Sequence, residues 1–303
     1  MKLVSSKYAG IDIGSNAVRL LIMHVHEYRG KTYFKKISLT RVPIRLGEDV
    51  FLKGEISERN KNRMLHAMKS FYHLMQLHEV DDHLACATSA MRDSSNGKEI
   101  VAEIAKETGI KIEIIDGKRE AELIYATQIE SILDNSKNYL YIDVGGGSTE
   151  LTLFANSEKQ TSQSFNIGTI RILHDLVEHD EWERMKNWLK INAREYTNLL
   201  AIGSGGNINR LYKMAGKTNW KHLKAVEIKK LEELLASYNF EERVTQLNLN
   251  TDRADVIIPA SNIFLNVLRW SKAHEVIVPK MGLSDGLVRL MHQKEKKAKR
   301  YLN

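Results

Sequence analysis

Cysteine and proline are scarce in this chain of 303 residues, which has one cysteine and three prolines. A single thiol, Cys86, excludes an internal disulfide framework and any metal site built from several cysteines, as is typical of a reducing compartment. No apolar run approaches the roughly 20 residues that a membrane-spanning helix needs, and no signal-peptide pattern precedes the first apolar segment. No Ser/Gly linker or low-complexity stretch separates two halves. We therefore expect a cytoplasmic globular protein with two intimately joined domains and no membrane partner.

Positive charge is in modest excess, because the chain has 45 Lys and Arg but 38 Asp and Glu, which gives a formal net charge of +7. Much of the excess lies in residues 294–300, a pattern typical of a solvated helix end. A positive excess also favours polyanionic ligands through electrostatic steering. A non-catalytic polyanion-binding module is therefore one hypothesis.

Two copies of one short pattern are the most informative feature that is present. Residues 8–16 and 141–149 each run from apolar residues into Asp, then through an apolar residue into Gly and a small hydroxyl residue, with Asp12 and Asp143 131 positions apart. Glycines let the backbone turn sharply with its amides exposed to an anion, and an Asp at the strand end can hold a hydrated divalent cation. Two unrelated turns would also contain Gly and Asp, but the repetition favours two related domains with the ligand in a cleft between them. The candidate phosphate-binding residues in the two loops are Gly14, Ser15, Asn16, Gly145, Gly146, Gly147 and Ser148.

Further polar residues follow other predicted strands. A third glycine cluster precedes a predicted helix, where backbone amides attract phosphate; its members are Gly203, Ser204, Gly205 and Gly206. A hairpin turn could bring Glu150 near Asp143 and one cation, and Mg²⁺ commonly takes one or two carboxylates. Arg92 follows a strand, and its guanidinium suits phosphate recognition. For Glu120, in a first helical turn, composition alone indicates only a helix-dipole role.

The apolar periodicity predicts an α/β fold with domains at 1–125 and 126–303. We expect an antiparallel meander over 7–13, 18–25 and 32–42, followed by alternating helices and strands of parallel β-α-β type. Further strands are expected at 83–88, 111–115, 138–143, 149–154, 160–166, 199–203 and 275–278. The expected helices span 57–77, 97–108, 118–133, 168–177, 180–199, 207–214, 227–237 and 254–271, with a last one from 283 onward.

At these motifs the sequence resembles the exopolyphosphatase and guanosine pentaphosphate phosphohydrolase family, within the superfamily of actin, sugar kinases and heat-shock chaperone ATPases. The matching stretches are residues 10–22, 87–92, 116–125, 141–150 and 201–206. The resemblance implies two ribonuclease H-like domains with a cleft between them, in the short, two-domain form of the family.

The resemblance also implies hydrolysis of a terminal phosphoanhydride and assigns roles. Glu120 would activate water, Arg92 would neutralise charge on the terminal phosphate, and Asp143 and Glu150 would handle Mg²⁺, with Asp12 as a further metal candidate. Departures from the family pattern occur at Arg119, Glu122 and Ser284.

The leading hypothesis is thus a Mg²⁺-dependent exopolyphosphatase that releases orthophosphate from inorganic polyphosphate. Guanosine pentaphosphate is the alternative substrate, and no segment indicates a guanine pocket that would decide between them. An ATP-dependent small-metabolite kinase is a further hypothesis, which would require an acceptor pocket. We expect no nucleic-acid partner, and a homodimer is possible.

Overall fold

A computed structural model describes residues 3–125, 134, 136–156, 158–196, 198–218, 221–279 and 281–301. The chain divides into two compact units: unit 1 is Met1–Gln128 with Gly282–Asn303, and unit 2 is Ile129–Met281. The first division falls close to the boundary predicted after residue 125. The C-terminal segment differs from the prediction, because it belongs to unit 1 and not to the second domain.

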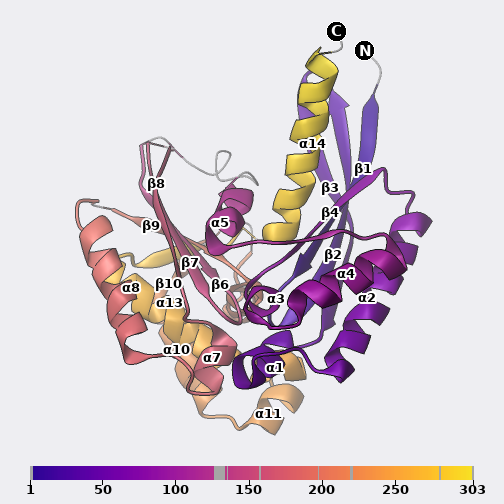
Figure 1. The fold of residues 1–303 in the computed structure, drawn as a ribbon. Coiled ribbons are helices and arrows are strands. Elements are labelled where there is room, and N and C mark those ends of the chain that lie inside the picture. The colour runs from indigo at the N-terminus through magenta and orange to yellow at the C-terminus, as the bar shows by residue number, and fades with distance from the viewer. Residues whose placement is uncertain are drawn as a thin grey trace. The chain divides into compact units, whose positions relative to one another are not determined.

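Unit 1 is built on a five-stranded sheet in the order β3-β2-β1-β4-β5 (Figure 1). The predicted meander is confirmed, since β1 pairs antiparallel with β2 and β2 with β3, whereas β4 is parallel to both β1 and β5. The strands are β1 (Val4–Ile13), β2 (Ala17–Tyr28), β3 (Lys31–Pro43), β4 (Asp82–Ala87) and β5 (Ile112–Ile114). The helices are α1 (Leu46–Lys53), α2 (Glu58–Leu77), α3 (Ser89–Asp93), α4 (Gly97–Thr108), α5 (Gly117–Tyr125) and α14 (Leu283–Tyr301).

Helix α2 covers one face of this sheet. Ser57 caps it, as its side chain accepts a hydrogen bond from the Asn60 amide. Apolar side chains recur at the three- and four-residue spacing of one helix face and are buried against alternate residues of β1 and β2. The helical residues of this cluster are Met64, Ala67, Met68, Phe71 and Met75.

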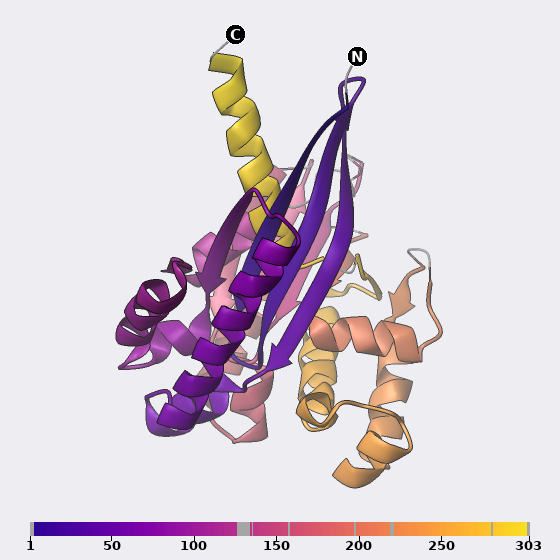
Figure 2. The same cartoon turned by 90° about the vertical axis from the view of Figure 1, so that its right-hand side faces the viewer.

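Helix α14 lies beside β1 and β2 although it is at the other end of the sequence, as Figures 1 and 2 both show. Val288 and Met291 pack against the face of the sheet that is opposite α2. Lys36 on β3 pairs with the buried Asp285 at 2.8 Å. This apolar face and ion pair explain why the C-terminal segment joins unit 1. The sheet residues in the cluster are Tyr8, Leu21, Met23 and Val25.

Gly10 is required where α14 crosses β1. A Cβ atom at Gly10 would lie 2.3 Å from the carbonyl oxygen of Ser284, which is backbone and cannot rotate away. We expect Gly10→Ala to displace α14 and lower the free energy of unfolding by about 1–3 kcal/mol, the usual cost of overpacking. Urea denaturation measures this. Gly282→Ala is the matched control because a Cβ there meets nothing within 4 Å, and equal stability of the two variants would contradict the prediction.

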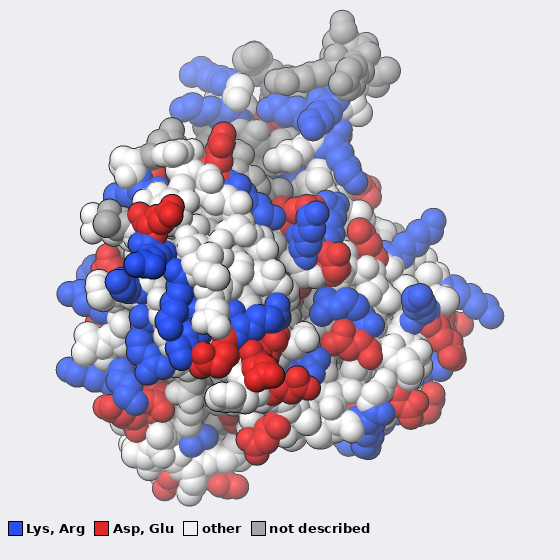
Figure 3. Space-filling model, turned by 60° about the vertical axis from the view of Figure 1, so that its left-hand side comes forward, with Lys and Arg blue, Asp and Glu red and all other residues white. Residues whose placement is uncertain are grey.

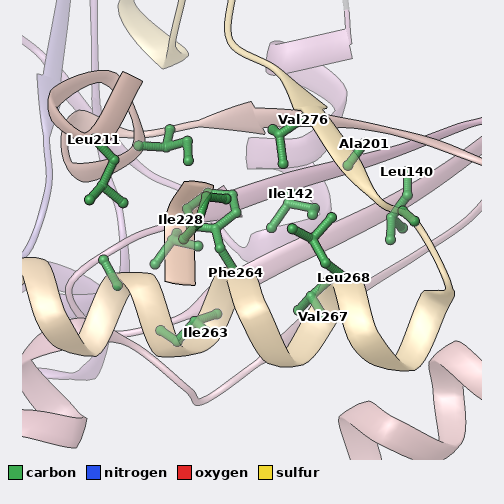
Figure 4. Packing of buried hydrophobic residues seen from close by; sticks show 14 of the residues in the cluster. Leu140, Ile142, Ala201, Leu211, Ile228, Ile263, Phe264, Val267, Leu268 and Val276 are labelled. Atoms are coloured by element: carbon green, nitrogen blue, oxygen red, sulfur yellow. The ribbon is translucent and has the colours of Figure 1, made fainter. Parts of the chain in front are cut away.

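Unit 2 has a six-stranded sheet in the order β10-β11-β9-β6-β7-β8. Its strands are β6 (Tyr139–Val144), β7 (Thr149–Ala155), β8 (Glu158–Phe165), β9 (Leu200–Ser204), β10 (Leu223–Lys224) and β11 (Glu275–Ile277). Its helices are α7 (Thr169–Leu173), α8 (His179–Asn192), α9 (Gly206–Met214), α10 (Ala225–Ala236), α11 (Phe240–Thr245), α12 (Thr251–Ala254) and α13 (Ile257–Ser271). Figure 4 shows α13 directing Phe264, Val267 and Leu268 toward Ile142 and Leu140 of β6.

Several predicted helices have different ends. Helix α8 stops at Asn192 and not at 199, and the helix predicted over 254–271 is confirmed as α13, which begins at Ile257 after the short helix α12. The predicted helix 118–133 is confirmed as α5 up to Tyr125, and residues 126–133 lie outside the described residues. Among the helices that the structure describes, none has the length and apolarity to cross a membrane.

Candidate active site

The two predicted glycine loops have the same hairpin geometry. In unit 1, Ile13 pairs with Val18, and the Gly14 amide donates to the Ala17 carbonyl at 3.2 Å. In unit 2, Val144 pairs with Thr149, and the Gly145 amide donates to the Ser148 carbonyl at 2.9 Å. The sheet order 3-2-1-4-5 of unit 1 is repeated in unit 2 as 8-7-6-9-11. The repeated sequence pattern therefore reflects two related folding units, each with its loop after the first strand of a meander.

In unit 2 three successive carbonyl groups of the loop, those of residues 145–147, are bonded to residues of α7. The amides of Thr169 and Ile170 donate to the carbonyls of Gly145 and Gly146 at 3.1 and 2.8 Å. The side chain of Arg171 donates from Nε to the Gly147 carbonyl at 2.9 Å. Because the C=O and N–H of one peptide point in opposite directions, the amides that follow these carbonyls face away from α7. Successive amides with one orientation form a concave anion site.

The loop of unit 1 is held in a related way. The Ser15 and Asn16 carbonyls accept hydrogen bonds at 2.8 and 3.0 Å from the Gly47 and Arg45 amides at the start of α1. The Ser15 hydroxyl lies 2.8 Å from that of Ser89, which begins α3. The structure therefore gives each of the two predicted phosphate loops a fixed backbone orientation.

The position opposite the loop aspartate differs between the two hairpins. Asp12 faces Arg19 across β1 and β2, and their side chains form an ion pair at 2.6 Å. Asp143 faces Glu150 across β6 and β7. Directly opposed residues of an antiparallel pair lie on the same face with Cβ atoms about 5 Å apart, where like charges repel. The second hairpin therefore places two carboxylates opposite each other, a donor set that suits a divalent cation, and the first places a carboxylate beside a guanidinium.

Glu150 is almost completely buried, with 3% of the residue exposed. Its Oε1 accepts hydrogen bonds from the hydroxyls of Ser148 and Ser164 at 2.6 and 2.9 Å. No cluster of three or more His, Cys, Asp and Glu suited to a metal occurs within the described ranges. Since Mg²⁺ needs only one or two protein carboxylates when phosphate and water complete its shell, Asp143 and Glu150 fit this ion.

Glu120 lies in the first turn of α5, where its amide is bonded to the Asp116 carbonyl at 2.9 Å. It is close enough to Cys86 on β4 to affect that thiol. Burial first, and then the negative charges of Glu113, Asp12 and Glu120, raise the pKa of Cys86 to about 12. Asp12 and Cys86 are register neighbours on β1 and β4. The structure thus places the predicted base Glu120 and the loop residue Asp12 both near Cys86 in unit 1, and it makes Cys86 an unreactive buried thiol.

Arg92 is in α3 and reaches the segment that leads into α5. Its Nη1 donates to the Ile115 carbonyl at 3.2 Å, and its Nε donates to Asp93 at 3.2 Å. Arg92 is therefore in the same region of unit 1 as Glu120. Arg19 is a further residue of this site that the sequence motifs did not reveal, although the short connection between β1 and β2 places position 19 opposite Asp12.

The third glycine cluster has two different functions in the fold. Gly203 lies inside β9, where a Cβ would be 2.8 Å from Val276 and 3.2 Å from Phe264, so that tight core packing requires glycine there. Gly205, which has a φ of 109°, is the residue directly before α9. A Cβ atom on it would lie 2.9 Å from the Val144 carbonyl oxygen and 3.6 Å from Asp143 Oδ1. The Ser204 hydroxyl donates to the Met281 carbonyl at 3.2 Å. The start of α9 at Gly206 is therefore adjacent to Asp143 and the second loop.

The departures from the family pattern also have structural outcomes. Arg119 and Glu122 form an ion pair at 3.3 Å on the exposed side of α5. These two departures thus pair with each other within the helix. Ser284, the third departure, is buried in the first turn of α14 against Gly10.

Two α/β units with mixed sheets, each with a glycine hairpin, define a protein of the actin-like ATPase fold that handles phosphate. Two solved structures share this fold. An exopolyphosphatase from Cytophaga hutchinsonii matches with a TM-score of 0.81 and 26% identity over 94% of this chain and 97% of that one. A family member from Aquifex aeolicus matches with a TM-score of 0.75 and 25% identity over 96% and 99%.

The chain belongs to the Ppx/GppA phosphatase family, whose model matches residues 23–295. It is therefore a hydrolase of phosphoanhydrides. Exopolyphosphatase 1 of Mycobacterium tuberculosis is 24% identical over 298 residues, 92% of this chain and 86% of the relative. A bifunctional 3-dehydroquinate synthase/phosphatase of Fusobacterium nucleatum is 30% identical over 293 residues, which are 89% of this chain but 44% of that relative. This chain thus spans less than half of the Fusobacterium protein.

Proposed function

We propose that the protein is a Mg²⁺-dependent exopolyphosphatase that removes the terminal phosphate of inorganic polyphosphate as orthophosphate. The observation that carries this proposal is the second hairpin, where a row of amides of one orientation adjoins the opposed carboxylates Asp143 and Glu150. Amide donors suit phosphate oxygens and the carboxylates suit a divalent cation. The exopolyphosphatase names of the Mycobacterium and Cytophaga proteins support polyphosphate as the substrate.

In the proposed reaction, Glu120 accepts a proton from the attacking water as the new P–O bond forms and the bond to the leaving phosphate breaks. Arg92 supplies a fixed positive charge to the terminal phosphate, and the loop amides orient its oxygens. Asp143 and Glu150 would hold Mg²⁺, which when bound neutralises phosphate charge. For Asp12 a metal role remains a prediction, and its carboxylate is paired with Arg19 in the structure.

Two other functions remain outcomes of the test. Guanosine pentaphosphate offers the same kind of terminal phosphoanhydride, and the family name covers this activity. A binding module would rely on a basic surface, but Lys and Arg lie among Asp and Glu on the face in Figure 3. Within the C-terminal basic run, Lys296 also lies 3.7 Å from Glu27. These observations favour a localised phosphate site over a broad basic surface.

The deciding experiment measures orthophosphate release by the purified protein with Mg²⁺ from long and short polyphosphate, guanosine pentaphosphate and ATP. We expect release from polyphosphate without any acceptor. Faster release from guanosine pentaphosphate would select the alternative substrate. No release from any of the four by folded protein would reject the proposal, and ATP turnover only with an acceptor would indicate a kinase.

Glu150→Gln tests the cation site. The substitution keeps the size of the side chain and its acceptor oxygen for the hydroxyls of Ser148 and Ser164 but removes one negative charge next to Asp143. We expect the Mg²⁺ concentration for half-maximal activity to rise roughly tenfold or more, the usual effect of weakening a metal's ligand set. A Mg²⁺ titration of the hydrolysis rate measures it. Glu158→Gln, at the other end of the β7–β8 pair, should leave the titration unchanged.

A further inference from the structure

Helix α7 lies directly behind the glycine loop of unit 2, and Arg171 in it donates to the last glycine of that loop. We infer that Arg171 is a positioning residue for phosphate binding, which acts by fixing the orientation of the Gly147–Ser148 peptide. The inference rests on the proposed function in that this loop binds phosphate. It assigns a role to a residue for which the sequence motifs gave no signal.

Hydrogen bonds from α7 set the direction of the peptide groups in the loop. Three successive loop carbonyls, those of Gly145, Gly146 and Gly147, accept hydrogen bonds from the segment 169–171. Each peptide is planar, so a carbonyl held toward α7 turns the following amide away from it. The amides of Gly146, Gly147 and Ser148 therefore share one direction, as an anion-binding concavity requires.

Without the hydrogen bond from Arg171, the Gly147–Ser148 peptide would be free to rotate. Glycine adopts positive and negative φ with similar ease, so a peptide next to glycine turns over readily unless both of its sides are held. The carbonyls of Gly145 and Gly146 are held by the backbone amides of Thr169 and Ile170, so truncating those two side chains would leave the hydrogen bonds in place. The Gly147 carbonyl is held by the Arg171 side chain at 2.9 Å. Arg171 therefore controls the direction of the Ser148 amide, which adjoins the Glu150 carboxylate through the Ser148 hydroxyl.

Unit 1 provides an internal comparison for this contact. Asn16 is the position equivalent to Gly147 in the repeated hairpin, and its carbonyl is held at 3.0 Å by the backbone amide of Arg45. The two loops thus hold the same carbonyl, one with a main-chain donor and the other with a guanidinium. Recurrence of the contact with different donors indicates that the orientation of this peptide is what both loops require.

The test compares Arg171→Gln with Arg243→Gln in the full chain. Arg243 is the matched control because its Nε donates to the Leu235 carbonyl at 2.7 Å and its Nη1 to the Ala254 carbonyl, so its loss removes the same kind of contact elsewhere in unit 2. Three quantities are measured for both variants: KM and kcat for polyphosphate, the inhibition constant of orthophosphate, and amide hydrogen exchange of peptides covering 145–150. Added ethylguanidinium tests chemical rescue of Arg171→Gln.

We expect Arg171→Gln to raise KM and the orthophosphate inhibition constant at least tenfold, with faster exchange confined to 145–150 and partial rescue by ethylguanidinium. Arg243→Gln should change none of these. Equal KM values and equal exchange in the two variants would overturn the inference. If the unsubstituted protein hydrolyses none of the substrates, the proposed function fails by itself, and the exchange comparison still decides whether Arg171 orders the loop.

Discussion

Glu120→Gln is expected to reduce orthophosphate release from polyphosphate by roughly a hundred- to ten-thousand-fold, the range for loss of a general base. The amide is isosteric with the carboxylate but cannot accept the proton of the attacking water. Because Gln has the size of Glu, the change removes one charge from the first turn of α5 without opening a cavity. Substrate binding should persist, so the loss is expected in kcat.

Glu122→Gln is the control for this prediction. Glu122 is in the same helix and pairs with Arg119 on its exposed side at 3.3 Å, so its loss removes only a surface ion pair, worth about 0–1 kcal/mol. Single-turnover measurement with each variant separates chemistry from binding. Comparable rates for Glu120→Gln and the unsubstituted protein would remove Glu120 from the mechanism, while a similar loss in both variants would indicate disruption of α5.

The sequence predicted those features of the site that depend on local pattern. The two hairpins were predictable because Asp and Gly interrupt apolar runs in the same order at 8–16 and 141–149. The strand pairing then follows from the short connections, and with it the opposition of Asp143 and Glu150. The fold class and the parallel pairing of β1, β4 and β5 followed from the alternation of helices and strands.

Contacts between distant segments could not be predicted in this way. The apolar face of α14 can be recognised in the sequence. The sheet that it packs on could not be predicted, because the packing brings Ser284 close to Gly10, which lies 274 positions away in the chain. For that reason the sequence placed the last helix in the wrong unit. Gly203 illustrates the same limit, since its place in a glycine cluster predicted phosphate contact while the structure shows core packing against Val276 and Phe264 as a sufficient reason for glycine.

Gly168, like Gly203, is a glycine that close packing requires. Its substitution by alanine is the second change for which we expect a large loss of activity. A Cβ on Gly168 would lie 2.3 Å from the Gly146 carbonyl oxygen and 2.4 Å from the Gly147 carbonyl carbon. These atoms belong to the backbone of the loop, so either the loop or the start of α7 must move. The hydrogen bonds from Thr169 and Ile170 to the loop carbonyls would be lost in that movement.

We therefore expect Gly168→Ala to lower kcat/KM for polyphosphate by a hundredfold or more, because the amides of the loop lose their common direction. The free energy of unfolding should fall by about 1–3 kcal/mol, as for other overpacked sites. Steady-state kinetics and urea denaturation measure the two effects, with Gly282→Ala again as the glycine control in open space. The kinetic loss should exceed that of Arg171→Gln, since Gly168 is in contact with two peptides of the loop and Arg171 holds one. A Gly168→Ala protein with unchanged kinetics would show that the loop tolerates displacement, and phosphate binding would then have to depend on side chains more than on the loop amides.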